Sequence, residues 1–157
     1  MEFQAIAGEL NEQVANWTTI LVSLSQETIT GLKNKQGRSI RQIVGHMVDS
    51  ASNNTHRAIH LQYQESPVDF PNYATYGNND KWIAVQNYQE ENWEVLVNYW
   101  KYTHLHFIHV IQNIKPEKLD QQWIADKNQF VSLKEMVEDF PRHFKLHIKE
   151  IEELCNS

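Results

Sequence analysis

The segment Pro141-Arg142-His143-Phe144-Lys145-Leu146-His147 lies near the C-terminus and places two histidines four residues apart. Around it, apolar residues recur every three or four positions from Leu133 to Leu154, which is the period of an amphipathic helix. On a helix, residues i and i+4 lie on the same face, so both imidazoles can reach one metal ion. By itself the pair is a weak signal, because the chain has eight histidines and some pair at helical spacing is expected by chance.

Four segments of the chain have helical periodicity, and no segment alternates apolar and polar residues convincingly as a strand does. They cover about residues 3–25, 39–64, 82–115 and 132–154. Ser39-Ile40-Arg41-Gln42 and Ser132-Leu133-Lys134-Glu135 are capping-box sequences, which mark the starts of the second and fourth helices. The pattern predicts an all-α protein with a single domain at 1–157, and the long connections at 65–81 and 117–131 allow a crossover.

Composition narrows the classes of function. A chain of 157 residues is long enough to bury a core, and its net charge of -6 argues against binding to a nucleic-acid backbone. The start lacks the features of a signal peptide, and no stretch approaches the roughly 18 apolar residues of a membrane span. We therefore expect a cytoplasmic protein with a small-molecule substrate and no nucleic-acid or membrane partner. Tryptophan-rich amphipathic helices are compatible with a homodimer.

Cysteine and histidine usage narrows the candidate sites. The single cysteine, Cys155, rules out an internal disulfide or a cysteine metal cluster and is a poor candidate for a nucleophile. His104, His106 and His109 resemble a metal site in one dimension, but on a helix their side chains fan out too widely to close on one ion. We expect His104 in the core and the other two histidines on the surface.

The second helical segment carries a polar stripe beside its apolar face. The stripe contains Asp49, Asn53, His56 and His60, and we interpret it as a solvated face. His46 lies at the edge of this stripe nearest the core. In an alternative interpretation, Asp49, one turn after His46, is a candidate for a catalytic general base.

Several segments resemble the DinB/YfiT-like superfamily. They are LSQE at 24–27, GRSIRQIVGHMVDS at 37–50, PNY at 71–73, DKWIA at 80–84 and the HxxxH pair. The resemblance covers nearly the whole chain and implies a four-helix bundle with one divalent ion, most often nickel or zinc, held by three histidines. Matched residue by residue, the metal ligands are His46, His143 and His147. The YfiT-like branch carries further histidines where this chain has Leu146 and Glu150.

The connection at 65–81 is rich in aromatic residues for a solvated loop, and long loops inside compact domains are often functional. Its aromatic side chains either pin the loop to the bundle or shape a pocket. Because PNY and DKWIA match the superfamily, our hypothesis is that Tyr73, Tyr76 and Trp82 lie near the mouth of the metal site and bind substrate.

The resemblance also implies a reaction class, because similar proteins are thiol S-transferases that use bacillithiol-like cofactors, or metal-dependent hydrolases. Three neutral imidazoles leave most of the +2 charge of an ion uncompensated, so a coordinated thiol ionises at neutral pH without a protein base. No Ser-His-Asp or Cys-His arrangement is evident in the chain. We expect metal-dependent transfer of a low-molecular-weight thiol, such as bacillithiol, to a small electrophile. The alternatives are hydrolysis and a non-catalytic, metal-binding stress-response protein.

Overall fold

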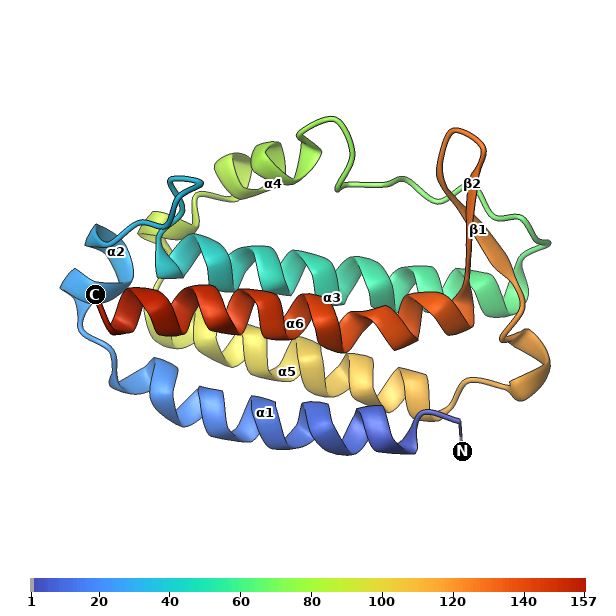
Figure 1. Ribbon diagram of the computed structural model, residues 1–157, viewed down its shortest axis with the longest axis horizontal. Coiled ribbons are helices and arrows are strands. Elements are labelled where there is room, and N and C mark those ends of the chain that lie inside the picture. Colours follow the sequence, from blue (N-terminus) through green and yellow to red (C-terminus); the bar gives the residue numbers. More distant parts are fainter. Residues whose placement is uncertain (1) are drawn as a thin grey trace.

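A computed structural model describes residues 2–157, and its four long helices form an elongated bundle (Figure 1). These helices are α1 (Gln4–Ser23), α3 (Ile40–Tyr63), α5 (Trp93–Gln112) and α6 (Leu133–Cys155). The all-α prediction is confirmed. Both predicted capping boxes are present, because the side chain of Ser39 accepts the Gln42 N–H and that of Ser132 accepts the Glu135 N–H.

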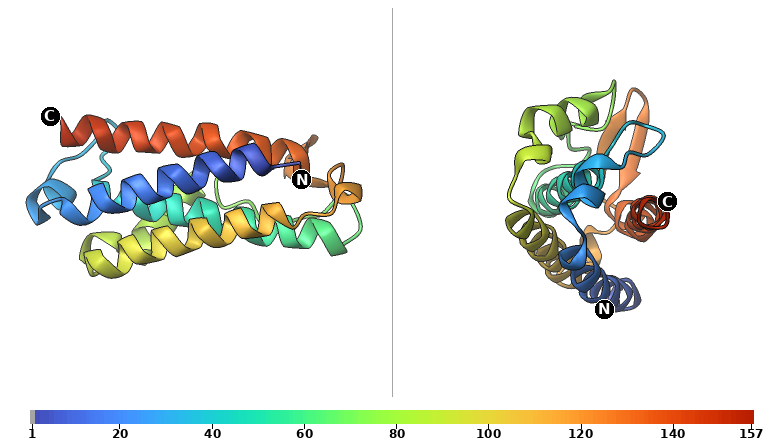
Figure 2. Two further views of the ribbon diagram at one scale, coloured as in Figure 1. Left: turned by 90° about the horizontal axis from the view of Figure 1, so that it is seen from below. Right: turned by 90° about the vertical axis from the view of Figure 1, so that its left-hand side faces the viewer.

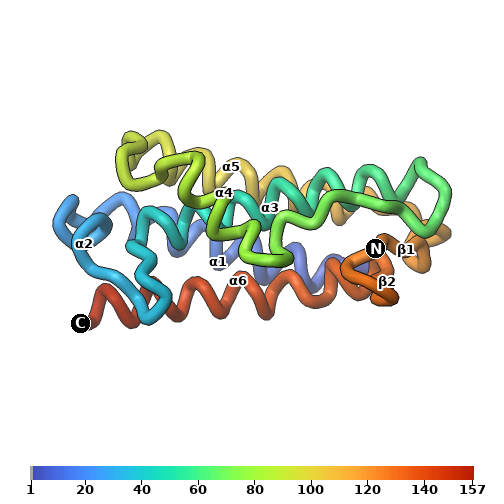
Figure 3. Tube along the Cα trace, turned by 90° about the horizontal axis from the view of Figure 1, so that it is seen from above, coloured from blue at the N-terminus to red at the C-terminus, as the bar shows by residue number. Residues whose placement is uncertain are grey.

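The bundle does not follow an up-and-down order. Seen from one end, α5 lies between α1 and α3, and α6 closes the ring against α3 and α1 (Figure 2). Helices α3 and α5 run in the same direction, so the chain returns along the bundle between them (Figure 1). This return segment, residues 64–92, is the crossover, and it lies on the α3 side of the bundle (Figure 3). The crossover allowed by the long first connection is therefore present.

The helix predicted at 82–115 is two helices. Helix α4 (Asn78–Gln86) lies within the crossover and ends at Asn87, whose φ of 51° is left-handed. A 3-10 turn, η1 (Tyr88–Glu90), follows, and α5 then begins where the Asn92 side chain accepts the Val95 N–H. The periodic pattern missed both boundaries because asparagine can adopt a left-handed conformation and cap a helix without breaking an apolar repeat. The predicted connection after residue 25 likewise contains a short helix, α2 (Gln26–Gly31).

The second long connection contains a small β-hairpin, which the sequence pattern did not indicate. After the turn η2 (Pro116–Lys118), strands β1 (Gln122–Asp126) and β2 (Gln129–Ser132) pair antiparallel, with Trp123 opposite Val131. The hairpin also holds the start of the crossover. The Val68 N–H donates to the Gln122 carbonyl at 2.8 Å, and the Ile124 N–H donates to the Val68 carbonyl at 2.9 Å. The two connections therefore meet at one end of the bundle.

The core is formed by the inward faces of the four long helices and is rich in aromatic side chains. Trp100, Phe107 and Phe144 are among its largest fully buried members. His104 is buried beside Trp100 and Phe144, as predicted. Within residues 2–157, no helix combines the length and the apolar character needed to cross a membrane.

Candidate metal centre

Three histidines from two antiparallel helices converge at the side of the bundle that faces the crossover. His46 comes from α3, and His143 and His147 come from α6. One ring nitrogen from each histidine lies within 4.8 Å of the other two. His46 and His147 are only 4% and 5% exposed, so water has little access to these rings. The structure brings together the three residues that the resemblance implied as ligands.

Side-chain contacts orient the rings of His143 and His147. His147 Nδ1 lies 2.8 Å from Glu150 Oε2, and an ionised carboxylate can only accept, so in the neutral ring the proton is on Nδ1 and Nε2 presents a lone pair. That lone pair faces His143 Nε2 at 3.1 Å. His143 Nδ1 lies 3.4 Å from Ser50 Oγ, which can accept the ring proton and so leave His143 Nε2 free as well. For comparison, two nitrogens bound tetrahedrally to zinc lie about 3.4 Å apart.

Burial keeps two of the three rings in the form that binds metal ions. Burial, together with a smaller effect of the neighbouring histidines, lowers the pKa of His46 to about 3 and that of His143 to about 4. Both imidazoles are therefore neutral at pH 7, as metal coordination requires. His46 Nδ1 is also buried without a hydrogen-bond partner among residues 2–157. A three-histidine set with two neutral rings and an unpaired buried nitrogen fits a divalent transition ion such as zinc or nickel.

Asp49 is buried, so the prediction that it lies on a solvated face was wrong. It is 2% exposed, and its Oδ1 accepts hydrogen bonds from Tyr88 Oη at 2.6 Å and Gln86 Nε2 at 2.8 Å. The crossover supplies both donors and covers this face of α3. Burial raises the pKa of Asp49 to about 6 despite these hydrogen bonds. A catalytic role for Asp49 stays a prediction, and the structure shows that one of its oxygens already anchors the crossover.

The rest of the polar stripe is divided between core and surface. Asn53 is also buried, and its amide donates to the Asp49 carbonyl at 2.8 Å. His56 is exposed, and His60 is partly exposed beside Tyr63. The solvated interpretation therefore fails for the first half of the stripe and holds for His56. Helical periodicity alone could not show that a later segment covers only one part of this face.

Gly45 explains how the crossover comes so close to α3. A Cβ atom at this position would lie 2.1 Å from Tyr88 Cδ2, far inside van der Waals contact. The ring of Tyr88 occupies the space that a side chain would fill, and its hydroxyl reaches Asp49 one turn further along α3. Gly45 thus allows the contact that fixes the end of the crossover, immediately before His46 in the sequence.

The three aromatic residues proposed for substrate binding occupy different environments. The ring of Tyr73 lies 6.4 Å from that of His46 and is 8% exposed. Trp82 lies beside it, with ring centres 5.5 Å apart. Tyr76 is 85% exposed and does not line the cavity next to the histidines. Substrate binding stays a prediction for all three. Tyr73 lines the cavity, whereas neither Trp82 nor Tyr76 does, and Trp82 packs against Tyr73.

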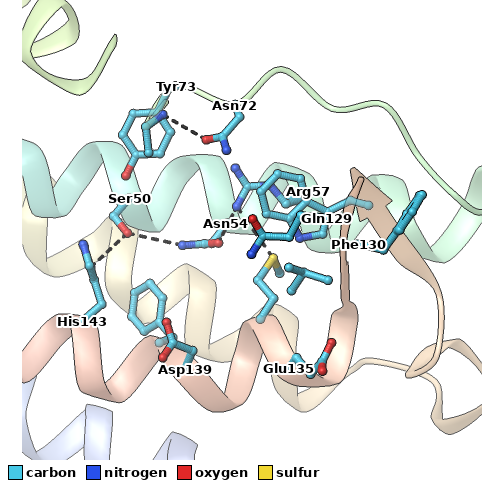
Figure 4. Close-up of a pocket in the computed structure, with 15 residues that line it drawn as sticks. Ser50, Asn54, Arg57, Asn72, Tyr73, Gln129, Phe130, Glu135, Asp139 and His143 are labelled. Atoms are coloured by element: carbon cyan, nitrogen blue, oxygen red, sulfur yellow. Dashed lines mark hydrogen bonds between the residues drawn. The ribbon is translucent and has the colours of Figure 1, made fainter. Parts of the chain in front are cut away.

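A cavity of about 530 Å³ has one of the three histidines, His143, in its wall (Figure 4). Its walls come from α3, α6, the crossover and the hairpin, and they include Ser50, Tyr73, Trp123, Phe140 and His143. His143 therefore belongs both to the histidine cluster and to the cavity wall. A molecule in this cavity can approach an ion held by the three histidines.

Sequence reasoning missed three residues at this site. Glu150 was noted only as a departure from the superfamily, although its spacing of three residues from His147 places it on the same helix face. Arg57 lines the cavity but lies in a stretch without a motif. Trp123 reaches the cavity through the hairpin, which was not predicted.

Neither a protein-family model nor a curated protein sequence matches the chain. Among solved structures, it is similar to YfiT from Bacillus subtilis, which is described as a probable metal-dependent hydrolase with an unusual four-helix bundle topology. The TM-score is 0.81, and the match covers 96% of this chain and 83% of YfiT with 16% sequence identity. The chain has the DinB/YfiT-like fold.

A second structure shares the DinB/YfiT-like fold, a mycothiol-dependent maleylpyruvate isomerase. The TM-score is 0.74 with 11% identity, and the match covers 94% of this chain but only 60% of the isomerase chain. At these identities the similarity shows the fold, and activity has to be argued from the residues of the site.

Proposed function

We propose that the protein is a metal-dependent enzyme that transfers a small thiol to an electrophile. The observation that carries this proposal is the convergence of three histidine nitrogens within 4.8 Å, one of them from His143 in the wall of a cavity of about 530 Å³. His46, His143 and His147 would hold one divalent ion, with zinc or nickel as the metal. Such an ion supplies Lewis acidity, which lowers the pKa of a thiol or a water molecule in its remaining coordination positions.

The chain's own residues prepare the site for this chemistry. Glu150 and Ser50 each contact the Nδ1 atom of a proposed ligand and so fix its orientation, a role that typically affects affinity and reactivity. Burial raises the pKa of Tyr73, so its phenol stays protonated near neutral pH and can donate a hydrogen bond. Tyr73 lines the cavity and lies beside His46, a position from which it can orient a substrate atom close to the ion.

The mycothiol dependence of the isomerase with this fold favours a thiol co-substrate, and the low-molecular-weight thiol we propose here is bacillithiol or a close analogue. Hydrolysis is the second candidate, because YfiT is described as a probable metal-dependent hydrolase and the same three histidines would serve it. The two reactions differ in whether a thiol is consumed.

The test begins with elemental analysis of protein purified without a chelating tag. We expect about one divalent ion per chain. The metal-loaded protein is then assayed with a halogenated aromatic electrophile and a panel of small thiols, and separately with esters and amides. Metal-dependent loss of thiol and electrophile together supports transfer, whereas turnover of an ester or amide without thiol supports hydrolysis. No turnover with the ion fully bound would support a non-catalytic metal-binding protein.

A further inference from the structure

Arg57 is a buried cation in the wall of the cavity (Figure 4). The residue is 4% exposed, and its guanidinium carbon lies 3.8 Å from the centre of the Trp123 ring. Its Nη1 donates to Asn54 Oδ1 at 2.8 Å and lies 3.9 Å from Met136 Sδ. Within residues 2–157, Nε is buried without a partner and Nη2 makes no hydrogen bond. The edge formed by Nε and Nη2 therefore has no protein acceptor.

No carboxylate neutralises this guanidinium. Two acidic residues line the same cavity, but Asp139 binds Arg142 through both oxygens, at 2.6 and 2.9 Å. Glu135 accepts the Ser132 N–H at the start of α6. Burial lowers the pKa of Arg57 to about 10, and no carboxylate is among the groups that oppose this shift. A buried charge without a partner is costly, and the contact with Trp123 offsets only part of that cost.

Arg57 and the histidine cluster lie on one continuous wall of the cavity. Ser50, Asn54 and Arg57 follow each other at helical spacing along α3, and Asn54 Nδ2 donates to Ser50 Oγ at 3.3 Å. Ser50 in turn contacts His143. The seven steps along the helix from Ser50 to Arg57 correspond to about 10 Å. The cavity thus has a proposed metal centre at one end and an uncompensated cation at the other.

We propose that Arg57 binds the carboxylate of an elongated small molecule whose reactive end reaches the three histidines. A guanidinium binds a carboxylate through charge-assisted hydrogen bonds, for which Nη2 has no protein acceptor, and a single positive charge suits a monovalent anion. The carboxylate site stands on the geometry of Arg57 alone, while the position of the reactive end rests on the proposed function. The thiol or the electrophile therefore carries an acid group separated from its reacting atom by an extended spacer.

The first experiment compares ligands on the unaltered protein. Zinc-loaded protein is titrated calorimetrically with 6-mercaptohexanoate and with its neutral analogue 6-mercaptohexan-1-ol. Because hydrogen bonds to charged groups are stronger than neutral ones, we expect the acid to bind about ten-fold more tightly. Equal affinities would overturn the proposal. Hexyl phosphate binding more tightly than hexanoate would also overturn it, since the site would then be one for phosphate.

The second experiment removes the cation. Arg57→Met keeps much of the side-chain volume, and we expect it to abolish the preference for the acid. Lys134→Met removes an exposed cation from α6, where Lys134 contacts Glu2, and we expect it to keep the preference. Circular dichroism checks folding. If Arg57→Met does not fold, the comparison of the two ligands on the unaltered protein decides.

The third experiment separates this inference from the proposed function. Hexanoate and hexanamide are titrated into metal-free protein, and the indole N–H resonance of Trp123 is followed by NMR. A preference for hexanoate without any zinc binding would sustain the carboxylate site and defeat the proposed function. Zinc binding without a preference for hexanoate would defeat the carboxylate site and leave the proposed function standing.

Discussion

Two groups of three histidines behave in opposite ways in this protein. His46, His143 and His147 are far apart in the sequence, yet their ring nitrogens lie within 4.8 Å of one another. His104, His106 and His109 are close together in the sequence, yet they do not converge. The His104 ring is buried and hydrogen-bonded to the Trp100 carbonyl at 2.6 Å, while the other two histidines are exposed with ring centres 6.2 Å apart.

The difference comes from helix geometry. Residues i and i+4 share a helix face, which brings His143 and His147 together, and a facing helix adds the third ring. Spacings of two and five residues instead direct His106 and His109 away from His104. Histidine density in a sequence is therefore a poor guide to a metal site, and spacing combined with a partner helix is a better one.

The largest expected effect is a loss of metal affinity when the converging histidines are replaced, and no loss when the clustered ones are. Replacing His46, His143 or His147 by alanine should lower zinc affinity by roughly 100-fold or more, because each change removes one of three ligands. His106→Ala and His109→Ala should leave it unchanged. Competition with a chromophoric chelator measures all five variants. Similar zinc affinities for all five variants would show that the two groups of histidines do not differ in metal binding.

The next effect concerns stability. His104→Ala should lower the free energy of unfolding by about 2–4 kcal/mol, because it leaves a cavity among buried aromatic side chains. Zinc affinity of the folded variant should not change. Urea unfolding of metal-free protein provides the measurement. A variant that loses zinc affinity while keeping its stability would place His104 in the metal centre instead.

A smaller effect is expected at Glu150. Glu150→Gln keeps an acceptor for His147 Nδ1 but removes its charge, so zinc affinity should fall about ten-fold. Glu152→Gln is the matched control, because that residue is exposed on the same helix. Equal affinities for both variants would mean that the carboxylate only packs against the ring.

The smallest effect is in the dependence of binding on pH. Since burial lowers the pKa of His46 to about 3 and that of His143 to about 4, both rings are already unprotonated above pH 5. At most one histidine proton can then compete with the metal ion between pH 5 and 6. The logarithm of zinc affinity should rise with pH by no more than one per pH unit over this range. A slope of two or three would show that the rings titrate like exposed histidines.

The parts of the structure that sequence predicted are those set by local spacing. Ser39 and Ser132 cap their helices as expected, and the burial of His104 follows from its place in an apolar stripe. The burial of Asp49 depends on Tyr88, 39 residues later, which no helical period can encode. The hairpin was missed because its strands are short, although Asn128, with a φ of 57°, marks the turn between them.

The residues of the candidate site also divide into those set by local spacing and those set by packing between distant segments. The resemblance supplied the three histidines, and Glu150 could have been found from its spacing to His147. Arg57 could not, because its significance comes from what surrounds it. Only the packed structure shows that Trp123 covers the guanidinium and that nearby carboxylates are engaged elsewhere.

The parallel arrangement of α3 and α5 also bears on how the chain folds. Helices that follow each other in an up-and-down bundle can pair early as local hairpins, whereas α1 packs mainly on α5, which lies some 70 residues further along. The pairing of α3 with α5 has to wait until the crossover has closed. Contacts between distant residues slow folding, so this bundle should reach its native state more slowly than an up-and-down bundle of equal length.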